Sequence, residues 1–245
     1  MVAVITGISG QDGAYLTKQL LSQGINIIGI LRGPTSSLKG LEYLGVNNEV
    51  EFIEIDLGNS ESMNGFLKSR KPDYIFNLAA QSSVAESFKN PHETILFNLH
   101  STLNILEAIR KYSPATKLYQ ATSSEMFGAI NKLPICENTL LNPQSPYAIS
   151  KSACHHLVRN YRESYNLHAS SGILFNHESV LRRDNFFIMK VIKSALDILN
   201  GKQEYLEVGN IEIKRDFGYA PDYVDAMVKM VQMVKSDDYI ICSGE

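Results

Sequence analysis

Short apolar segments, rich in β-branched residues, alternate along the first two thirds of this chain with segments whose apolar residues recur at helical spacing. The short segments predict buried strands at 2–6, 25–30, 50–55, 74–78 and 117–121. Helices are predicted after Gly13, over 60–70, from Pro91 with Leu96, Leu99, Leu103 and Leu106 on one face, and after Pro146. Strands alternating with helices predict an α/β protein with a doubly wound parallel sheet, whose ligands bind at the carboxyl ends of the strands.

The alternation weakens from about residue 176. A helix at 184–199, an extended segment around 204–213, a helix at 221–235 and a short strand at 238–242 are predicted there. We therefore interpret 1–175 as a Rossmann-type dinucleotide-binding domain. The remainder, 176–245, is interpreted as a smaller substrate-binding lobe interleaved with a late strand of the sheet.

Glycines recur in the turn that joins the first predicted strand to its helix. Such a loop lets backbone N–H groups approach a phosphate, and it directs the N-terminus of a helix toward the negative charge. A strand immediately before the turn and a helix immediately after it favour dinucleotide binding over an ordinary tight turn. The predicted cradle consists of Gly7, Ile8, Ser9, Gly10, Gln11, Asp12 and Gly13.

The second predicted strand ends at Arg32 rather than at an acidic residue. In dinucleotide-binding folds an acid at this place holds a free ribose 2′-hydroxyl, whereas an arginine suits a 2′-phosphate. Arg32 therefore favours NADP over NAD; the alternative is a solvated loop arginine. Asp56 and Leu57, after the third strand, are expected at the edge of the adenine pocket, and the small residues that follow Leu78 would let the cofactor lie close to the fourth strand.

Composition excludes several classes of partner. A net charge of −3, from 23 basic and 26 acidic residues, gives no electrostatic basis for binding nucleic acid or an anionic membrane surface. No apolar run reaches the length of a membrane span, and no signal-peptide pattern is present. Three scattered cysteines form neither a disulfide framework nor a metal site, and His155 and His156 have no third ligand at metal spacing. We expect a cytoplasmic protein without a metal.

Two clusters of reactive side chains lie where this fold would place them. Ser123 and Glu125 follow the fifth predicted strand, and Tyr147 and Lys151 share a helix face at i and i+4. A lysine ammonium near the phenol is expected to lower the pKa of Tyr147 and make it a general base. The alternative is that Tyr147 is only the first residue of a core-facing helical stripe.

These residues and several longer strings resemble one family. The strings are 6–16, 78–82, 172–179, 209–210 and 214–220. Together they resemble the GDP-mannose 4,6-dehydratase family of the extended short-chain dehydrogenase/reductase superfamily, almost from end to end. The Asn-His-Glu-Ser string at 176–179 is the most specific of them, because the wider superfamily does not share it.

The resemblance implies a role for each matching position. Catalysis would fall to Ser123, Glu125, Tyr147 and Lys151. NADP would be bound by 7–13 together with Arg32, Asp56, Leu57, Leu78, Ala79, Ala80, Gln81, Ser82, Lys151, His177 and Arg182. A GDP-sugar would contact Ser83, Asn176, Asn185, Lys190 and Arg215, since amides and cations suit phosphate oxygens. Without the surrounding string, His177 would be interpreted as a core histidine, and Arg182 as a surface residue.

The implied activity is a redox-neutral 4,6-dehydration of a GDP-hexose, with GDP-mannose giving GDP-4-keto-6-deoxymannose, by a lyase that is a homodimer or homotetramer. Alternatives are a sugar-nucleotide epimerase or reductase, which would have little use for Glu125, and a non-catalytic NADP-binding module. Four departures from the family pattern stand out: Ser123 replaces a threonine, Val180 and Leu181 replace proline and arginine, Gly33 replaces an arginine, and Glu93 replaces a tyrosine. Family members also continue beyond the position of Glu245, so we expect either a reduced ending or a fragment with an incomplete substrate lobe.

Overall fold

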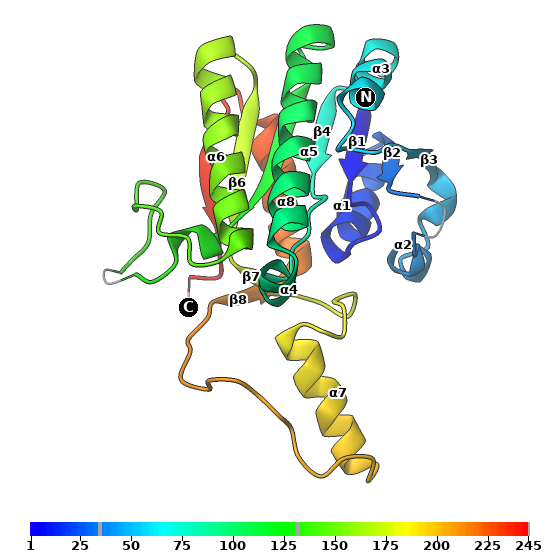
Figure 1. Ribbon diagram of the computed structural model, residues 1–245. Helices are drawn as coiled ribbons and strands as arrows, with labels where there is room; N and C mark the ends of the chain where they lie inside the picture. The colour runs from blue at the N-terminus through cyan, green and yellow to red at the C-terminus, as the bar shows by residue number, and fades with distance from the viewer. Residues whose placement is uncertain (34–35, 131–132, 245) are drawn as a thin grey trace.

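Apolar segments form a seven-stranded parallel sheet in the computed structural model, which describes residues 1–33, 36–130 and 133–244 (Figure 1). Glu245, the end of the predicted lobe, lies outside this part. The strand order is β3-β2-β1-β4-β5-β6-β9. The strands are β1 Val2–Thr6, β2 Asn26–Leu31, β3 Val50–Glu54, β4 Tyr74–Asn77, β5 Lys117–Ser123, β6 Ala169–Leu174 and β9 Asp238–Ile241.

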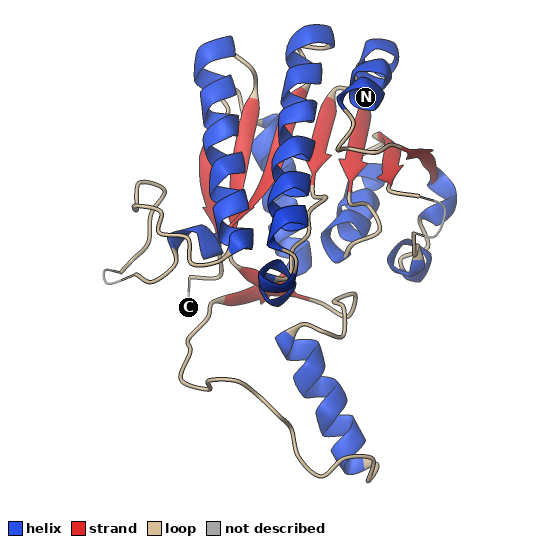
Figure 2. Ribbon diagram, in the orientation of Figure 1, coloured by secondary structure: helices blue, strands red, loops and turns tan. Residues whose placement is uncertain are grey.

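Helices cover both faces of this sheet (Figure 2). The helices are α1 Gln11–Ser22, α2 Lys39–Tyr43, α3 Ser60–Arg70, α4 Val84–Lys89, α5 Pro91–Tyr112, α6 Pro146–Tyr165, α7 Phe187–Leu199 and α8 Ala220–Gln232, with short 3-10 turns η1 Asn47–Glu49 and η2 Ser124–Phe127. Helices α1 and α8 share one apolar core with the sheet, and α3, α5 and α6 share the other. The predicted doubly wound architecture is confirmed.

A second, two-stranded sheet joins distant parts of the chain below the main one. Strand β7 (Asn176–Glu178) pairs in parallel with β8 (Phe217–Tyr219), so that His177 lies opposite Gly218. Between the two strands, α7 extends away from the main sheet and has no buried residue among those described (Figure 1). The proposed division at residue 176 stays a prediction.

Three details differ from the sequence-based predictions. Strand β6 was not predicted, because Ala169, Ser170, Ser171 and Gly172 carry no β-branched signal, although all four are buried. The expected extended segment at 204–213 forms no strand. The leucine stripe of α5 is only partly buried: Leu106 is buried and Leu103 packs against the core, whereas Leu96 is exposed. The buried side chains of this helix also include Asn98, Ser101 and Thr102.

Gly13 has no room for a side chain, and this supports a stability prediction. A Cβ at Gly13 would lie 2.5 Å from the Cα of Ile8 and 2.6 Å from the carbonyl oxygen of Gly7, which are backbone atoms that cannot rotate away. Gly13→Ala is expected to lower the free energy of unfolding by about 1–3 kcal/mol, the usual cost of overpacking. Urea denaturation monitored by circular dichroism measures this difference.

The matched control is Gly65→Ala in α3, where a Cβ meets nothing within 4 Å. There alanine is expected to stabilise the protein by about 0.5–1 kcal/mol, because glycine loses more backbone entropy in a helix. Equal stability changes for the two variants would contradict the tight packing described for Gly13.

Candidate active site

The candidate site lies where neighbouring strands of the main sheet send their connections to opposite faces. Strands β1 and β4 are adjacent, and the helices that follow them, α1 and α5, cover opposite faces. In doubly wound sheets this switch point, at the carboxyl ends of the strands, forms the ligand crevice. Gly7, in the turn after β1, has a φ of +69° and packs against the segment after β4. A Cβ at Gly7 would lie 2.8 Å from the amide nitrogen of Ala79. Glycine is therefore required at position 7.

The N-terminus of α1 opens directly from this turn. Gly10 is the N-cap and donates its N–H to the carbonyl oxygen of Gly7 at 2.9 Å. Among the described residues no side chain caps the helix, so its first-turn N–H groups have no side-chain acceptor. Close backbone approach and uncapped N–H groups suit the phosphates of a dinucleotide. The predicted cradle therefore has the geometry that such a group requires.

Strand β7 holds the first residues of α1 through three side-chain contacts. Gln11 Nε2 donates to the carbonyl oxygen of His177 at 3.2 Å, and Ser179 Oγ donates to Gln11 Oε1 at 2.8 Å. His177 Nε2 lies 2.9 Å from Asp12 Oδ2. Burial alone would raise the pKa of Asp12, but the His177 cation holds that pKa below its ordinary value. Burial likewise opposes protonation of His177, yet Asp12 raises the pKa of His177 above its ordinary value.

Residues predicted to hold the adenosine part lie at the ends of β2 and β3. Arg32 follows β2, is exposed, and has its Cζ 5.9 Å from the centroid of the Phe97 ring. Asp56 accepts the N–H of Gly58 at 2.9 Å, and Leu57 is buried in the core. Because β2 and β3 are parallel neighbours, these residues share one edge of the sheet with the glycine turn.

The segment after β4 is fixed by side chains that sequence reasoning did not identify. Ala79 donates its N–H to Thr6 Oγ1 at 3.1 Å, which ties the segment to β1. Gln81 donates its N–H to Asn98 Oδ1 at 2.9 Å, and Asn98 Nδ2 donates to Ser150 Oγ at 2.9 Å. Asn98 thus links the segment to α6. No sequence signal distinguishes Asn98, which is one of several polar residues of α5.

The remaining residues of this segment continue along the crevice into α4. Leu78 and Ala80 are half-buried and Ser82 is exposed. Ser83 is the N-cap of α4, and its side chain accepts the N–H of Glu86 at 3.3 Å. The Ser83 hydroxyl, predicted to face substrate, therefore also serves the helix.

The four predicted catalytic side chains lie at the end of β5 and the beginning of α6. Ser123 ends β5, and its Oγ accepts the N–H of Glu125 at 3.3 Å. Tyr147 occupies the first turn of α6, where the Ser123 hydroxyl lies close enough to lower the pKa of the Tyr147 phenol in part. Lys151 is buried one turn later and donates from Nζ to the carbonyl oxygen of Ala121 at 2.9 Å. The structure therefore brings together two clusters that are at least 22 residues apart in the sequence, counting from Glu125 to Tyr147.

The expected lowering of the pKa of Tyr147 is wrong for this arrangement. Burial raises the pKa of Tyr147 to about 12, and the interaction with the Ser123 hydroxyl only partly offsets that effect. Lys151 Nζ lies 5.8 Å from the centroid of the Tyr147 ring and is bonded to a backbone carbonyl rather than to the phenol. Burial also lowers the pKa of Lys151. Spacing at i and i+4 placed the two residues on one face, but it could not show burial or direction.

The other predicted cations and amides fall into two groups, near the predicted catalytic residues and away from them. Arg215 Nη2 lies 4.0 Å from Glu125 Oε1. Arg182 forms an ion pair of 3.1 Å with Glu178, and its charge offsets a part of the rise in the pKa of Tyr147. Asn176 lies in β7, and its carbonyl oxygen accepts a hydrogen bond from Tyr223. By contrast, the exposed side chains of Asn185 and Lys190, before and within α7, have no hydrogen bond or ion pair with the catalytic residues in the described structure.

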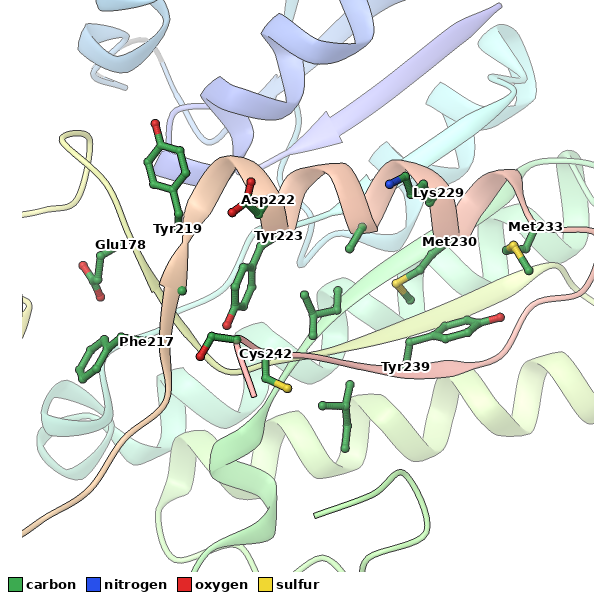
Figure 3. Close-up of a pocket in the computed structure, with 15 residues that line it drawn as sticks. Glu178, Phe217, Tyr219, Asp222, Tyr223, Lys229, Met230, Met233, Tyr239 and Cys242 are labelled. Atoms are coloured by element: carbon green, nitrogen blue, oxygen red, sulfur yellow. The ribbon is translucent and has the colours of Figure 1, made fainter. Parts of the chain in front are cut away.

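A cavity of about 760 Å³ lies elsewhere, between α8 and β9 (Figure 3). Tyr223, Met230, Tyr239 and Cys242 are among its lining residues, whereas none of the predicted site residues lines it. Among the described residues no cluster of His, Cys, Asp and Glu suits a metal ion, and the cysteines are unpaired. Within the same residues no helix has the length and apolarity needed to span a bilayer.

The glycine turn at the switch point and the Ser123–Tyr147–Lys151 cluster define the class as a short-chain dehydrogenase/reductase of the epimerase/dehydratase type. The UDP-glucose 4-epimerase of Thermotoga maritima is similar in fold, with a TM-score of 0.88 and 23% identity over 100% of this chain and 78% of that one. The Thermus thermophilus UDP-glucose 4-epimerase, solved as a complex with NAD, has a TM-score of 0.85 and 26% identity over 100% of this chain and 78% of its own.

Sequence comparison narrows the class to a family. The family profile described as GDP-mannose 4,6 dehydratase matches residues 4–245. GDP-mannose 4,6 dehydratase 1 of Arabidopsis thaliana is 42% identical over 255 aligned residues, which cover 100% of this chain and 70% of that protein. The chain belongs to the GDP-mannose 4,6-dehydratase family.

Proposed function

We propose that this protein binds NADP and catalyses the redox-neutral 4,6-dehydration of a GDP-hexose, with GDP-mannose as the first candidate. The position of Glu125 carries this proposal. The Glu125 backbone N–H donates to Ser123 Oγ, and both Ser123 and Glu125 lie close enough to influence the pKa of Tyr147, so a carboxyl group and a tyrosine hydroxyl meet at the end of β5. Membership of the family supports GDP-mannose as the substrate and GDP-4-keto-6-deoxymannose as the product.

The chemistry divides between a bound cofactor and the side chains of this chain. When bound, NADP⁺ supplies a hydride acceptor and a positive charge at the strand ends. Tyr147 removes the proton of the sugar 4-hydroxyl, and Ser123 donates a hydrogen bond to the same oxygen. Lys151 holds the carboxyl-terminal part of β5 through the carbonyl oxygen of Ala121.

Glu125 acts after the sugar carries a ketone at C4. That ketone acidifies the C5–H bond, and the Glu125 carboxylate removes the proton. Protonation of the leaving 6-hydroxyl by the same carboxyl group releases water and leaves a double bond between C5 and C6. The hydrogen taken from C4 would then return to C6 and a proton to C5, which gives the 4-keto-6-deoxy sugar without net oxidation. Ser124 precedes Glu125 where a separate acid could have stood, so one carboxyl group serves as base and as acid.

Arg32 supports NADP rather than NAD, although the T. thermophilus neighbour was solved with NAD. No acidic residue stands at the end of β2 to hold a free 2′-hydroxyl, and an exposed guanidinium suits a 2′-phosphate. Arg32→Asp is expected to weaken NADP binding about 10- to 100-fold, which corresponds to a charged hydrogen bond of about 1.5–3 kcal/mol, and to strengthen NAD binding. Calorimetric titration with both dinucleotides measures the change in preference.

The control for Arg32 is Lys68→Asp, which makes the same charge change in the last turn of α3. This turn leads to the amino end of β4, at the opposite edge of the sheet from the glycine turn. The control is expected to leave the ratio of the two affinities unchanged. An unchanged ratio in Arg32→Asp would contradict the assignment of Arg32 to the 2′-phosphate.

Product analysis tests the activity itself. The protein is incubated with GDP-mannose and NADP⁺, and the sugar is examined by NMR. A 4-keto-6-deoxy product without net formation of NADPH supports the proposal. A C4-epimerised hexose, or NADPH formed in proportion to product, would instead identify the epimerase or oxidoreductase alternative. Binding of NADP with no turnover of any nucleotide sugar would favour a non-catalytic NADP-binding module.

Light scattering measures the molar mass in solution and so tests the expected homodimer or homotetramer.

A further inference from the structure

Both ring nitrogens of His177 face groups that can only accept a hydrogen bond. Nδ1 lies 2.8 Å from the carbonyl oxygen of Phe175, and Nε2 lies 2.9 Å from Asp12 Oδ2. A carbonyl oxygen has no proton to donate, and neither has an ionised carboxylate. A neutral imidazole carries one N–H and could satisfy only one of these two partners. The pair of contacts therefore requires a hydrogen on each nitrogen, which only the cation has.

Asp12 lies where an ionised carboxylate is stabilised. It is in the first turn of α1, at the positive end of the helix dipole, and Gln11 Nε2 donates to its Oδ1 at 3.1 Å. Burial and the interaction with Asp12 raise the pKa of Tyr119, so that phenol remains neutral. The carboxylate form of Asp12 leaves His177 as the proton-bearing partner.

The other groups around His177 include one that opposes a positive charge on its ring and several that favour it. Arg182 opposes the charge on His177 and Glu178 favours it, and these two residues form an ion pair with each other. From α8, the Tyr223 ring stacks on the imidazole with centroids 4.5 Å apart and an interplanar angle of 25°. An aromatic face stabilises an adjacent cation. Asp12, from α1, supplies the compensating negative charge.

We propose that His177 is a doubly protonated imidazolium at neutral pH, and that it acts as a positioning residue which fastens the N-terminus of α1 to β7. Gln11 reinforces the same junction through the carbonyl oxygen of His177 and the hydroxyl of Ser179. Because α1 begins at the glycine turn, this fastening sets the direction of the uncapped N–H groups. The cofactor part of this inference rests on the proposed function, whereas the protonation state does not.

The contribution of the pair to stability has a defined pH window. The pKa of His177 is raised above 6.5, so its contribution is complete below that value and is lost as the pH rises through the folded-state pKa. The pKa of Asp12 is lowered below 3.8, so its contribution is present above that value and is lost as the pH falls through its folded-state pKa. The fastening is expected to hold at neutral pH and to weaken in alkaline solution.

NMR of the protein labelled with nitrogen-15 at histidine tests the protonation state without cofactor or substrate. Long-range proton–nitrogen correlations distinguish a doubly protonated ring from either neutral tautomer, and His177→Asn assigns the signal among the six histidines. His155 is an internal control: it is also buried, it lies 3.7 Å from Asp238, and burial lowers its pKa. At pH 7 we expect His177 doubly protonated and His155 neutral. A neutral His177 would overturn the proposal.

Asp12→Asn tests the coupling. Losing the carboxylate is expected to lower the titration midpoint of His177 by about 1–3 pH units, the usual effect of an adjacent charge. NADP binding is expected to weaken most between the two midpoints, where only the parent protein keeps the His177 cation. Asp225→Asn, which removes a carboxylate from α8 that accepts a hydrogen bond from Gln19 of α1, should leave the midpoint unchanged. An unchanged midpoint in Asp12→Asn would refute the coupling. A shifted midpoint with unchanged NADP affinity would refute only the part that rests on the proposed function.

Discussion

Glu125→Gln is expected to bind NADP and GDP-mannose as the parent protein does, while elimination of water slows by about 10²- to 10⁴-fold, the usual contribution of a positioned acid–base group. The carboxamide has nearly the same shape, and the backbone N–H of residue 125 still donates to Ser123 Oγ, so the substitution changes only the charge that faces Arg215 at 4.0 Å. The carboxamide cannot accept the C5 proton. The reaction should therefore stop after oxidation at C4.

Two readouts separate this outcome from a general loss of structure. Calorimetry measures binding of the cofactor and of the nucleotide sugar, and NMR in heavy water measures deuterium at C5 of the product. The Glu125→Gln variant should still bind the cofactor and the nucleotide sugar, but it should not incorporate deuterium at C5. Glu61→Gln, an exposed carboxyl in the first turn of α3, should retain both. Full dehydration by Glu125→Gln would remove Glu125 from the mechanism.

Tyr147→Phe is expected to lower turnover by about 10²- to 10⁴-fold at an earlier step, because no side chain then removes the 4-hydroxyl proton. Tyr147 is 8% exposed, so the phenyl ring keeps most of its packing and the fold should persist. The measurement is the rate at which the C4 hydrogen leaves its original position, followed with GDP-mannose deuterated at C4. In Glu125→Gln this hydrogen should still be removed, whereas in Tyr147→Phe it should remain.

The conservative control at this site is Ser123→Thr. Its hydroxyl can still bond to Tyr147 and to the sugar oxygen, so turnover is expected to stay close to that of the parent protein. Ser123→Ala removes one neutral hydrogen bond and is expected to cost about 0.5–1.5 kcal/mol, which is smaller than the loss in Tyr147→Phe. Equal activity in Tyr147→Phe and the parent protein would mean that another group accepts the proton.

Local patterns were sufficient to predict most of the sheet and the position of the candidate catalytic groups. Strand β1 is rich in β-branched residues and β4 is largely apolar, and the glycine turn lies between a strand and a helix in the sequence itself. Strand β6 was missed because its first four residues are small and not β-branched, and because the strand is defined by its pairing with β5 on one side and β9 on the other. Such a strand is defined by neighbours that are distant in sequence.

The parts that sequence could not supply depend on tertiary environment. Burial, rather than the spacing to Lys151, sets the pKa of Tyr147. The contact between Asp12 and His177 joins residues 165 positions apart, and no local pattern indicates it. Amphipathic spacing correctly predicted α7, but it could not show that no described residue of this helix would be buried.

The central claim is that hydrogen leaves C4 and returns at C6 within one sugar molecule during dehydration. The most direct measurement uses a mixture of GDP-mannose deuterated at C4 and undeuterated GDP-mannose labelled with carbon-13, with products analysed by mass spectrometry and NMR. The account predicts a 4-keto-6-deoxy product with deuterium at C6, confined to molecules without carbon-13. Deuterium shared between the two populations, deuterium lost to solvent, or a product that keeps its 6-hydroxyl would contradict it.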